Sequence, residues 1–274
     1  FVSIILVVSF QGLAERQECL KVAFLDVGQG DAAFIQFPDG RNMLIDGGDC
    51  KEYSNAGQRH VIPYLKRQGI RHIDILALTH ADNDHIGGLP YILRNIKVDR
   101  IVDTGYAADH EFYQDYLHLI DSLKVEYQKM KAGETILEAL NYAVFVFNPC
   151  DSLKYDDINN ASLVMKIIYG DVSFLLTGDI EDQAEKYLLR YGDALKCDVL
   201  KVAHHGSKTS SIEQFLHYAA PEFAVISVGA YNRFNHPSPL VVDRLRKFGT
   251  QVIRTDENGA VIFKSDGRSI KRLR

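Results

Sequence analysis

Short apolar runs alternate with amphipathic stretches along most of the chain, and this alternation predicts an α/β protein. Strand-like runs cover residues 21–26, 32–37, 41–46, 73–78, 162–169, 172–177, 198–203 and 223–228. Helical spacing of apolar residues marks 59–68, 111–123 and 239–248, and another helix begins near position 85. The first of these helices is followed by Gly69, a residue typical of helix C-caps.

Each half of the chain runs through several strands and then through a strand, a polar turn and a helix. No proline-rich or low-complexity linker separates the two halves. We therefore expect residues 21–274 to form one domain, in which two β-sheets lie face to face with helices on both outer sides. Loops at 148–160 and 229–237 are expected to lie over a site at the strand ends.

Residues 1–10 are almost wholly apolar and begin with Phe rather than Met. This run is too short to span a bilayer by itself. Together with the polar stretch that follows, residues 1–20 are interpreted as the remnant of a signal peptide or of a transmembrane helix, plus a linker. A buried first strand is the alternative. A remnant of either kind predicts an extracytoplasmic location, secreted or attached to the cell membrane.

Composition narrows the choice of partners only slightly. The 274 residues include 46% hydrophobic side chains, which is enough for a sizeable core, and the net charge is −5. That charge gives no global basic footprint for nucleic acid, although a metal site can supply positive charge locally. The four cysteines show no CxxC spacing, which argues against a zinc ribbon or a redox motif.

The strongest chemical signal is a group of four potential metal ligands within six positions: His80, Asp82, Asp84 and His85. Two carboxylates in a partly desolvated turn between a strand and a helix need positive charge, which one or two divalent metal ions would supply. Alternate residues of an extended segment point the same way, so His80 and Asp82 can share one metal. Asp84 and His85 then turn toward a second. The alternative, Asp84 as a helix N-cap between core histidines, explains only one residue of the four.

Later strands end in the same kinds of side chain. Asp179 follows an apolar strand and precedes a helix, where a carboxylate can bridge two metals or simply cap the helix. His204 and His205 follow the strand-like run 198–203. We favour His204 as the ligand because it continues the strand, with His205 beside the site, but the sequence leaves the two almost equal. Asp46 ends another strand and is suited to orienting a ligand from behind.

These motifs together resemble the metallo-β-lactamase family. The segment His80-Ala-Asp-Asn-Asp-His85 is similar to its HxHxDH signature, with Asp82 where the second histidine usually stands. Over residues 21 to about 265 the order of motifs resembles the extracytoplasmic hydrolase domain of the bacterial ComEC-type competence proteins. The other matching motifs are Asp26-Val-Gly-Gln-Gly-Asp31, Leu44-Ile-Asp-Gly-Gly48, Asn159-Asn-Ala-Ser-Leu-Val164, Leu175-Leu-Thr-Gly-Asp179, Ala203-His-His-Gly-Ser207 and Asn232-Arg-Phe-Asn-His-Pro237.

The resemblance implies an αββα sandwich with metals held at the strand ends between the sheets. The ligand set that it implies is His80 and Asp82 for a first metal, Asp84, His85 and His204 for a second, and Asp179 as the bridge. Asn160 or Ser162 falls where the fold normally supplies another histidine, so Asn160 is a candidate ligand and Ser162 a supporting residue. Because oxygen ligands favour manganese or magnesium relative to zinc, we expect a manganese-tolerant site, with zinc as the other candidate.

Such a site favours a metal-dependent hydrolase, above all a phosphodiesterase that cleaves extracellular or incoming single- or double-stranded DNA with a metal-activated hydroxide. Asp84 would orient the hydroxide. His236, His205 or Lys208 would stabilise the transition state or protonate the leaving oxygen. The alternatives are a lactonase, β-lactamase or phosphocholine esterase on the same scaffold, and a non-catalytic module that binds DNA or a partner. The membrane portion of a longer protein is a further candidate partner.

Overall fold

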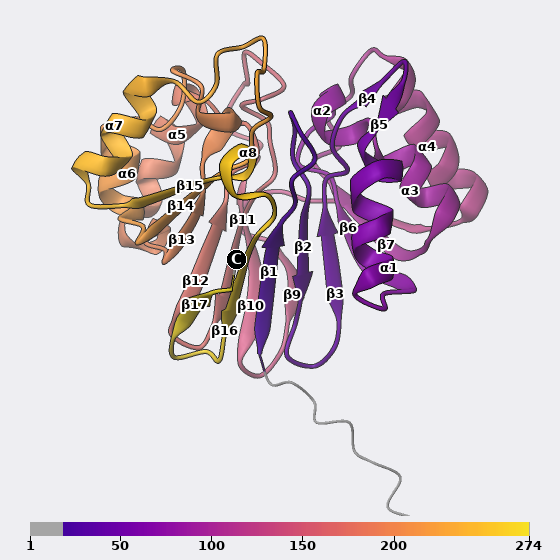
Figure 1. Cartoon of the computed structure of the whole chain (residues 1–274), viewed down its shortest axis with the longest axis horizontal. Helices are drawn as coiled ribbons and strands as arrows, with labels where there is room; N and C mark the ends of the chain where they lie inside the picture. The colour runs from indigo at the N-terminus through magenta and orange to yellow at the C-terminus, as the bar shows by residue number, and fades with distance from the viewer. Residues whose placement is uncertain (1–18, 274) are drawn as a thin grey trace, which may run out of the picture.

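Two β-sheets lie face to face in the computed structural model, and helices cover the outer face of each sheet (Figure 1). The predicted four-layer αββα sandwich is therefore confirmed. The structure describes residues 19–273, so the interpretation of residues 1–20 falls almost wholly outside the described part and stays a prediction. Within the described part, no helix combines the length and apolar character that crossing a membrane requires.

The first sheet has eight strands. In spatial order they are β17 (Ile270–Arg272), β16 (Val261–Ser265), β1 (Leu20–Phe24), β2 (Ala33–Gln36), β3 (Asn42–Ile45), β6 (His72–Ala77), β7 (Lys97–Asp103) and β8 (Glu126–Lys129). Strands β1 to β3 form an antiparallel meander, whereas β3, β6, β7 and β8 run parallel because helices connect them. The last two strands return to this sheet beside β1.

The second sheet has seven strands. In spatial order they are β15 (Gln251–Arg254), β14 (Phe223–Ile226), β13 (Val199–Lys201), β12 (Val172–Leu176), β11 (Val164–Tyr169), β10 (Tyr142–Asn148) and β9 (Thr135–Glu138). Strands β9 to β12 are antiparallel, and β12 to β15 are parallel. Each half of the chain therefore passes from an antiparallel to a parallel arrangement.

Helices pack on both outer faces, where a second and a third hydrophobic cluster lie. Those on the first sheet are α1 (Ile62–Arg67), α2 (Asn83–Ile86), α3 (Leu89–Asn95) and α4 (Glu111–Leu123), and those on the second are α5 (Asp182–Leu188), α6 (Glu213–Ala219) and α7 (Pro239–Lys247). The short hairpin of β4 (Cys50–Lys51) and β5 (Ser54–Asn55) precedes α1, and α8 (Thr255–Asn258) follows β15. Figure 1 shows the two groups of helices on opposite sides of the sandwich.

The predicted elements agree with the structure best where apolar spacing is strong. The helix predicted at 111–123 is α4 with the same bounds. The helix predicted at 59–68 begins instead with a π-helical turn, Gly57–Val61, that continues into α1. Strand β8 was not predicted, because its sequence, Glu-Tyr-Gln-Lys, lies at a sheet edge with mostly exposed side chains and so carries no apolar alternation.

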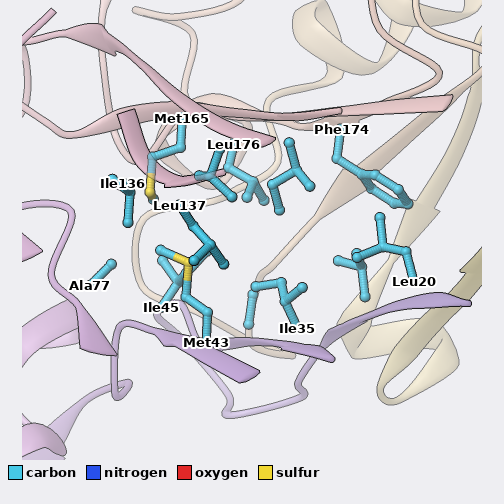
Figure 2. Packing of buried hydrophobic residues seen from close by; sticks show 14 of the residues in the cluster. Leu20, Ile35, Met43, Ile45, Ala77, Ile136, Leu137, Met165, Phe174 and Leu176 are labelled. Carbon is cyan, nitrogen blue, oxygen red and sulfur yellow. The ribbon is translucent and has the colours of Figure 1, made fainter. Parts of the chain in front are cut away.

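The central core fills the space between the sheets (Figure 2). Met43 and Ile35 of the first sheet point toward Met165 and Leu176 of the second. At one end of this core the fully buried ring of Phe263, on β16, lies among three other aromatic rings. Their centroid distances from Phe263 are 6.4 Å for Phe24, 6.2 Å for Phe174 and 5.3 Å for Phe223.

We predict that Phe263→Ala lowers the free energy of unfolding by about 3–5 kcal/mol, because it leaves a cavity between the two sheets. Urea denaturation followed by circular dichroism measures the change. Phe248→Ala, at a 41% exposed site after α7, is the control and should change the free energy by less than about 1 kcal/mol. Equal effects of the two substitutions would show that Phe263 does not join the sheets energetically.

Candidate metal centre

Buried imidazole and carboxylate side chains from both sheets meet at one edge of the sandwich, the edge where α2 lies in Figure 1. Overlapping groups of potential ligand atoms lie within 4.8 Å of one another: His80 with His85 and Asp179, Asp84 with His85 and His205, and Asp31 with Asp179 and His205. The strands β6, β12 and β13 end here, because parallel strands present their carboxyl ends to the same edge of a sheet. The structure thus brings together four of the predicted metal ligands, His80, Asp84, His85 and Asp179. It also places His205, predicted to lie beside the site, within the same cluster.

The two histidines of the turn between β6 and α2 direct their Nε2 atoms toward the centre of the cluster. His80 Nδ1 lies 3.1 Å from the Thr79 hydroxyl, and His85 Nδ1 lies 2.8 Å from Asp46 Oδ2. The Thr79 hydroxyl donates its hydrogen to Asp46 Oδ2, so it can only accept from His80. In the neutral rings, hydrogen then sits on Nδ1 and each Nε2 keeps a lone pair. Neither Nε2 has a hydrogen-bond partner among residues 19–273.

Asp46 lies behind His85 and joins two strands of the first sheet. It directly follows β3, with a left-handed backbone (φ 58°), and is almost fully buried. Its Oδ1 accepts the backbone N–H of Thr79, just beyond β6, at 2.8 Å. The carboxylate therefore contacts both the His85 ring and the backbone from which the turn 79–85 starts. These contacts are the ones that a residue orienting a metal ligand would need.

Asp179 is held by a tight turn after β12. The preceding Gly178 has φ of +54°, and a Cβ there would lie 2.8 Å from the Cβ of Ser162, so the turn requires glycine. The backbone N–H of Asp179 donates to Ser162 Oγ at 3.1 Å. Ser162 thus supports Asp179 from behind, while the carboxylate faces His85 Nε2 at 3.3 Å without hydrogen-bond geometry.

The adjacent histidines after β13 point in different directions. His204 and His205 both have left-handed backbones (φ 48° and 52°), so strand alternation stops at Lys201. His205 is buried, with Nδ1 2.9 Å from the Ser227 carbonyl and Nε2 3.1 Å from both Asp84 Oδ2 and Asp179 Oδ2. His204 lies outside this group and contacts Glu181 Oε1 through Nδ1 at 3.1 Å. The structure therefore favours His205 over the predicted His204 as the potential ligand.

Two residues of the cluster were not predicted as site residues. Asp31 ends the glycine-rich turn after β1, and Lys201 lies in β13. The Lys201 ammonium pairs with Asp31 Oδ2 and lies 3.5 Å from Asp179 Oδ1 and 3.2 Å from the Gly178 carbonyl. A lysine inside an otherwise apolar strand is the sequence signal that points to this buried ion pair.

Asn160 lies outside the cluster and caps a helix. Its side-chain oxygen accepts the backbone N–H groups of Glu181 and Ala184, at 2.9 and 3.1 Å, at the start of α5. The side-chain nitrogen donates to Asp156 at 2.9 Å. With both ends of the amide engaged, the structure gives no support to Asn160 as a metal ligand.

The other predicted residues lie at the rim. Asp82 Oδ2 is 3.8 Å from His80 Nε2, but its side chain is 44% exposed and joins none of the buried groups. The His236 ring lies 5.7 Å from that of His204, one layer outside the cluster. Lys208 is exposed. Asp82 therefore stands close enough to face an ion beside His80, whereas Lys208 and His236 can meet only a molecule that approaches from solvent.

The family model of the metallo-beta-lactamase superfamily matches residues 25–230, which is three quarters of the chain. The matched residues include every residue of the cluster. The chain belongs to this superfamily. The order of its motifs, which first suggested the family, is thereby explained by common descent.

Curated relatives connect this superfamily member with competence proteins. It is 34% identical over 261 residues to "ComE operon protein 3" of Bacillus subtilis, covering 90% of this chain and 33% of the relative. It is 32% identical over 269 residues to "Competence protein ComA" of Neisseria gonorrhoeae, covering 97% and 35%. The chain spans about a third of the length of the curated relatives that it matches.

Solved structures support the fold. YhfI from Bacillus subtilis, described as a metallo-beta-lactamase fold protein, superposes with a TM-score of 0.58 at 12% identity, covering 90% of this chain and all of that one. Igni18, a metallo hydrolase from Ignicoccus hospitalis, gives a TM-score of 0.53 at 16% identity, covering 89% and 98%. At such low identity the likeness concerns the fold alone.

Burial and charge act against each other on the pKa values of this superfamily site. Burial disfavours a charged His205, but Asp179 and Asp84 outweigh it and raise the pKa of His205 to about 10. The pKa of His85 is likewise raised against the effect of burial, chiefly by Asp179. Burial lowers the pKa of His80, and a charged His85 lowers it further. Without an ion, the cluster thus compensates its carboxylates with protons on two of its histidines.

The residues fit a divalent metal ion. The Nε2 atoms of His80 and His85 and one oxygen of Asp31 are buried without a hydrogen-bond partner in the described part of the chain, although buried polar atoms are normally satisfied. An ion beside Asp179 would satisfy them. Imidazole nitrogen and carboxylate oxygen together suit zinc, manganese or iron, and the abundance of carboxylates favours manganese over a zinc-only site.

We predict that His205→Gln lowers the affinity for Mn²⁺ or Zn²⁺ by more than about 100-fold, whereas His204→Gln changes it less than about threefold. The two substitutions are chemically identical and adjacent in sequence, so they control for each other. Isothermal titration calorimetry on protein freed of metal measures both. A larger loss for His204→Gln would restore the ligand choice that strand alternation suggests.

We also predict that the affinity for metal rises with pH. Below the raised pKa values of His85 and His205 each ring carries a proton that the metal must displace, so binding releases protons and weakens as pH falls through 7 to 6. Calorimetry at pH 7 in buffers with different ionisation enthalpies should show the release of about one or two protons. Binding without proton release would contradict the charge state described here.

Proposed function

We propose that this chain is a metal-dependent phosphodiesterase that cleaves DNA outside the cytoplasmic membrane. The supporting observation is that the buried Nε2 atoms of His80 and His85 face Asp179 and have no hydrogen bond within residues 19–273. They lie at an edge of the sandwich where Asp84 lines a groove open to solvent. A site of that composition is of little use to a module that only binds DNA, because buried polar atoms without hydrogen bonds destabilise a fold unless they serve another purpose.

His80, His85, Asp179 and His205 would hold one or two divalent ions, with Asp31 and Asp84 as further oxygen ligands. Bound divalent ions neutralise charge on a phosphodiester and lower the pKa of water, which is the chemistry that phosphodiester hydrolysis at neutral pH needs. Because these ligands come from segments far apart in the chain, the ions would also tie the two sheets together at the edge where substrate enters.

Asp84 is the candidate for orienting the attacking water. It is the most exposed carboxylate of the grouped residues, with 27% of its side chain accessible. Burial raises its pKa, but the hydrogen bond from His205 and the charges of His85 and His205 outweigh burial and hold that pKa well below its usual range. Asp84 is therefore ionised at neutral pH and can accept a hydrogen bond from water.

In this proposal His236 and Lys208 would contact the substrate rather than the ions. Burial, together with the charges of His204 and His205, lowers the pKa of His236 to about 4. A neutral His236 can donate a hydrogen bond to a phosphoryl oxygen, but it carries no spare proton for a leaving group at pH 7. That role then falls to solvent or to the exposed ammonium of Lys208.

The relatives favour DNA over other substrates of the fold. Their names link them to competence, and one, from Haemophilus influenzae, is called "Recombination protein 2". Competence and recombination both handle DNA, so a hydrolase within such proteins would act on incoming strands. We infer that the described residues are one part of a longer, membrane-associated bacterial protein, whose membrane portion would bring DNA to the site.

The proposal is tested by a matrix of metals and substrates. We predict that Mn²⁺ supports cleavage of single- or double-stranded DNA, while nitrocefin and lactones are hydrolysed poorly. Asp84→Asn should reduce the DNA cleavage rate by at least about 100-fold with little change in melting temperature, because the residue lies outside the hydrophobic core. Gel analysis of labelled oligonucleotides gives the rates, and thermal unfolding checks the fold.

Asp121→Asn, at an exposed position of α4, is the matched control and should cleave DNA at the wild-type rate. A purified chain that holds metal and leaves both forms of DNA intact would refute the phosphodiesterase. Efficient turnover of nitrocefin or a lactone in its place would assign the site to another hydrolase of the same fold.

A further inference from the structure

A groove runs from the metal centre to the loop that precedes α7. Its volume is about 720 Å³, within the range of roughly 300–1,000 Å³ typical of ligand sites. Asp84 and Asn83 line one part of it, and residues 229–234 line another. Because Asp84 belongs to both the metal cluster and the groove, a chain bound along the groove passes directly over the candidate centre.

Tyr231 presents a solvent-exposed aromatic ring at this groove. It is fully exposed, and no other ring or cation in residues 19–273 lies against it. Its backbone is left-handed (φ 56°), a conformation that costs free energy for a bulky residue. Exposing a large ring at a strained position gives no benefit to folding, so the position is explained better by a ligand that the ring contacts.

The ring of the neighbouring Phe234 differs from that of Tyr231, because it already contacts other side chains. The Arg233 guanidinium lies 4.9 Å from the Phe234 ring centre, and the His236 ring lies nearly parallel to it at 5.8 Å. Cation–π contact restrains the exposed Arg233 beside the groove. The loop therefore offers a free aromatic face and, two positions later, a positioned cation.

Asn232 fixes this loop from within. Its side-chain nitrogen donates to the carbonyls of Gly229 and His236, at 3.0 and 2.7 Å, and its oxygen accepts the N–H groups of Phe234 and His236, at 3.2 and 3.0 Å. Beyond the loop, the Ser238 N–H donates to the Gly206 carbonyl at 2.8 Å, next to His205. These bonds hold the backbone of the loop that carries Tyr231 and Arg233 next to the metal cluster.

We propose that the loop 229–237 is a platform for an unpaired strand of DNA, with a base stacked on Tyr231 and a backbone phosphate bound by Arg233. Stacking needs an exposed base face, which a duplex buries, so the platform selects single-stranded over duplex DNA. Carboxylates nearby would repel the backbone unless a cation offsets them. Of the two cations that line the groove, Lys51 pairs with Asp49, so Arg233 is the one available to a phosphate. This inference rests on the proposed function for its substrate class.

The stacking contact is tested by combining a protein substitution with removal of the base. On a single-stranded oligonucleotide, Tyr231→Ala should raise KM about 5- to 100-fold. For the wild-type chain, an oligonucleotide with abasic sites should raise KM by a similar factor. The substitution and the abasic sites together should raise KM no more than either change alone. Tyr231→Phe should keep most of the affinity. Tyr218→Ala, on an exposed ring of α6, is the control.

The phosphate contact has its own readout. Arg233→Ala should reduce the slope of log affinity against log salt concentration by about 0.7, the contribution of one phosphate in a single strand. Fluorescence of 2-aminopurine in the strand, measured with Ca²⁺ in place of Mn²⁺, reports stacking without cleavage. Tyr231→Gly should bind the strand more weakly while unfolding at an equal or higher temperature, because glycine relieves the left-handed strain.

The outcomes separate this inference from the proposed function. If no DNA is cleaved but stacking and affinity still depend on Tyr231, the phosphodiesterase fails and the platform stands. If DNA is cleaved and Tyr231→Ala leaves KM unchanged, the platform fails and the enzyme stands. If Tyr231→Ala raises KM by the same factor on normal and on abasic strands, the effects of the two changes are additive. The ring would then only maintain the loop, which also overturns the platform.

Discussion

Negative charge concentrated where the two sheets meet is the constraint on which the rest of this structure depends. Asp31, Asp46 and Asp179 are buried within one small region, and Asp84 stands at its mouth. Burying carboxylates costs free energy unless cations and hydrogen bonds compensate them. The Lys201 ammonium and the surrounding histidines supply that compensation. A divalent ion held by the carboxylates and neutral imidazoles would add to it.

The sequence was sufficient for the fold because its signals are local and strong. Apolar strands, amphipathic helices and polar turns follow one another in both halves, and α4 has the predicted bounds. The clustering of His80, Asp84, His85 and Asp179 was also foreseeable, because parallel strands end at a common edge. The weakly apolar edge strand β8 could not be predicted in this way, because only its pairing with β7 makes it a strand.

The finer geometry of the centre depended on backbone conformations that residue types do not encode. Left-handed backbones at His204 and His205 break strand alternation. As a result His205, and not the expected His204, faces the cluster. Asn160 stands near the expected position in the chain, but its amide meets the N–H groups of a helix start instead of the cluster. The sequence does not identify Asp31 as a site residue, because only the fold brings it to its partner Lys201 on the other sheet.

Lys201 belongs to a strand of the second sheet, so its positive charge arrives with folding and stays in place afterwards. Small zinc domains lose their structure when the ion leaves, because nothing else offsets their ligands. Here the Lys201 ammonium beside Asp31 and Asp179 offsets part of the negative charge of the carboxylates even without an ion. A chain that binds a divalent ion here would therefore be expected to keep its fold when a competing chelator removes the ion, and to take up another without refolding.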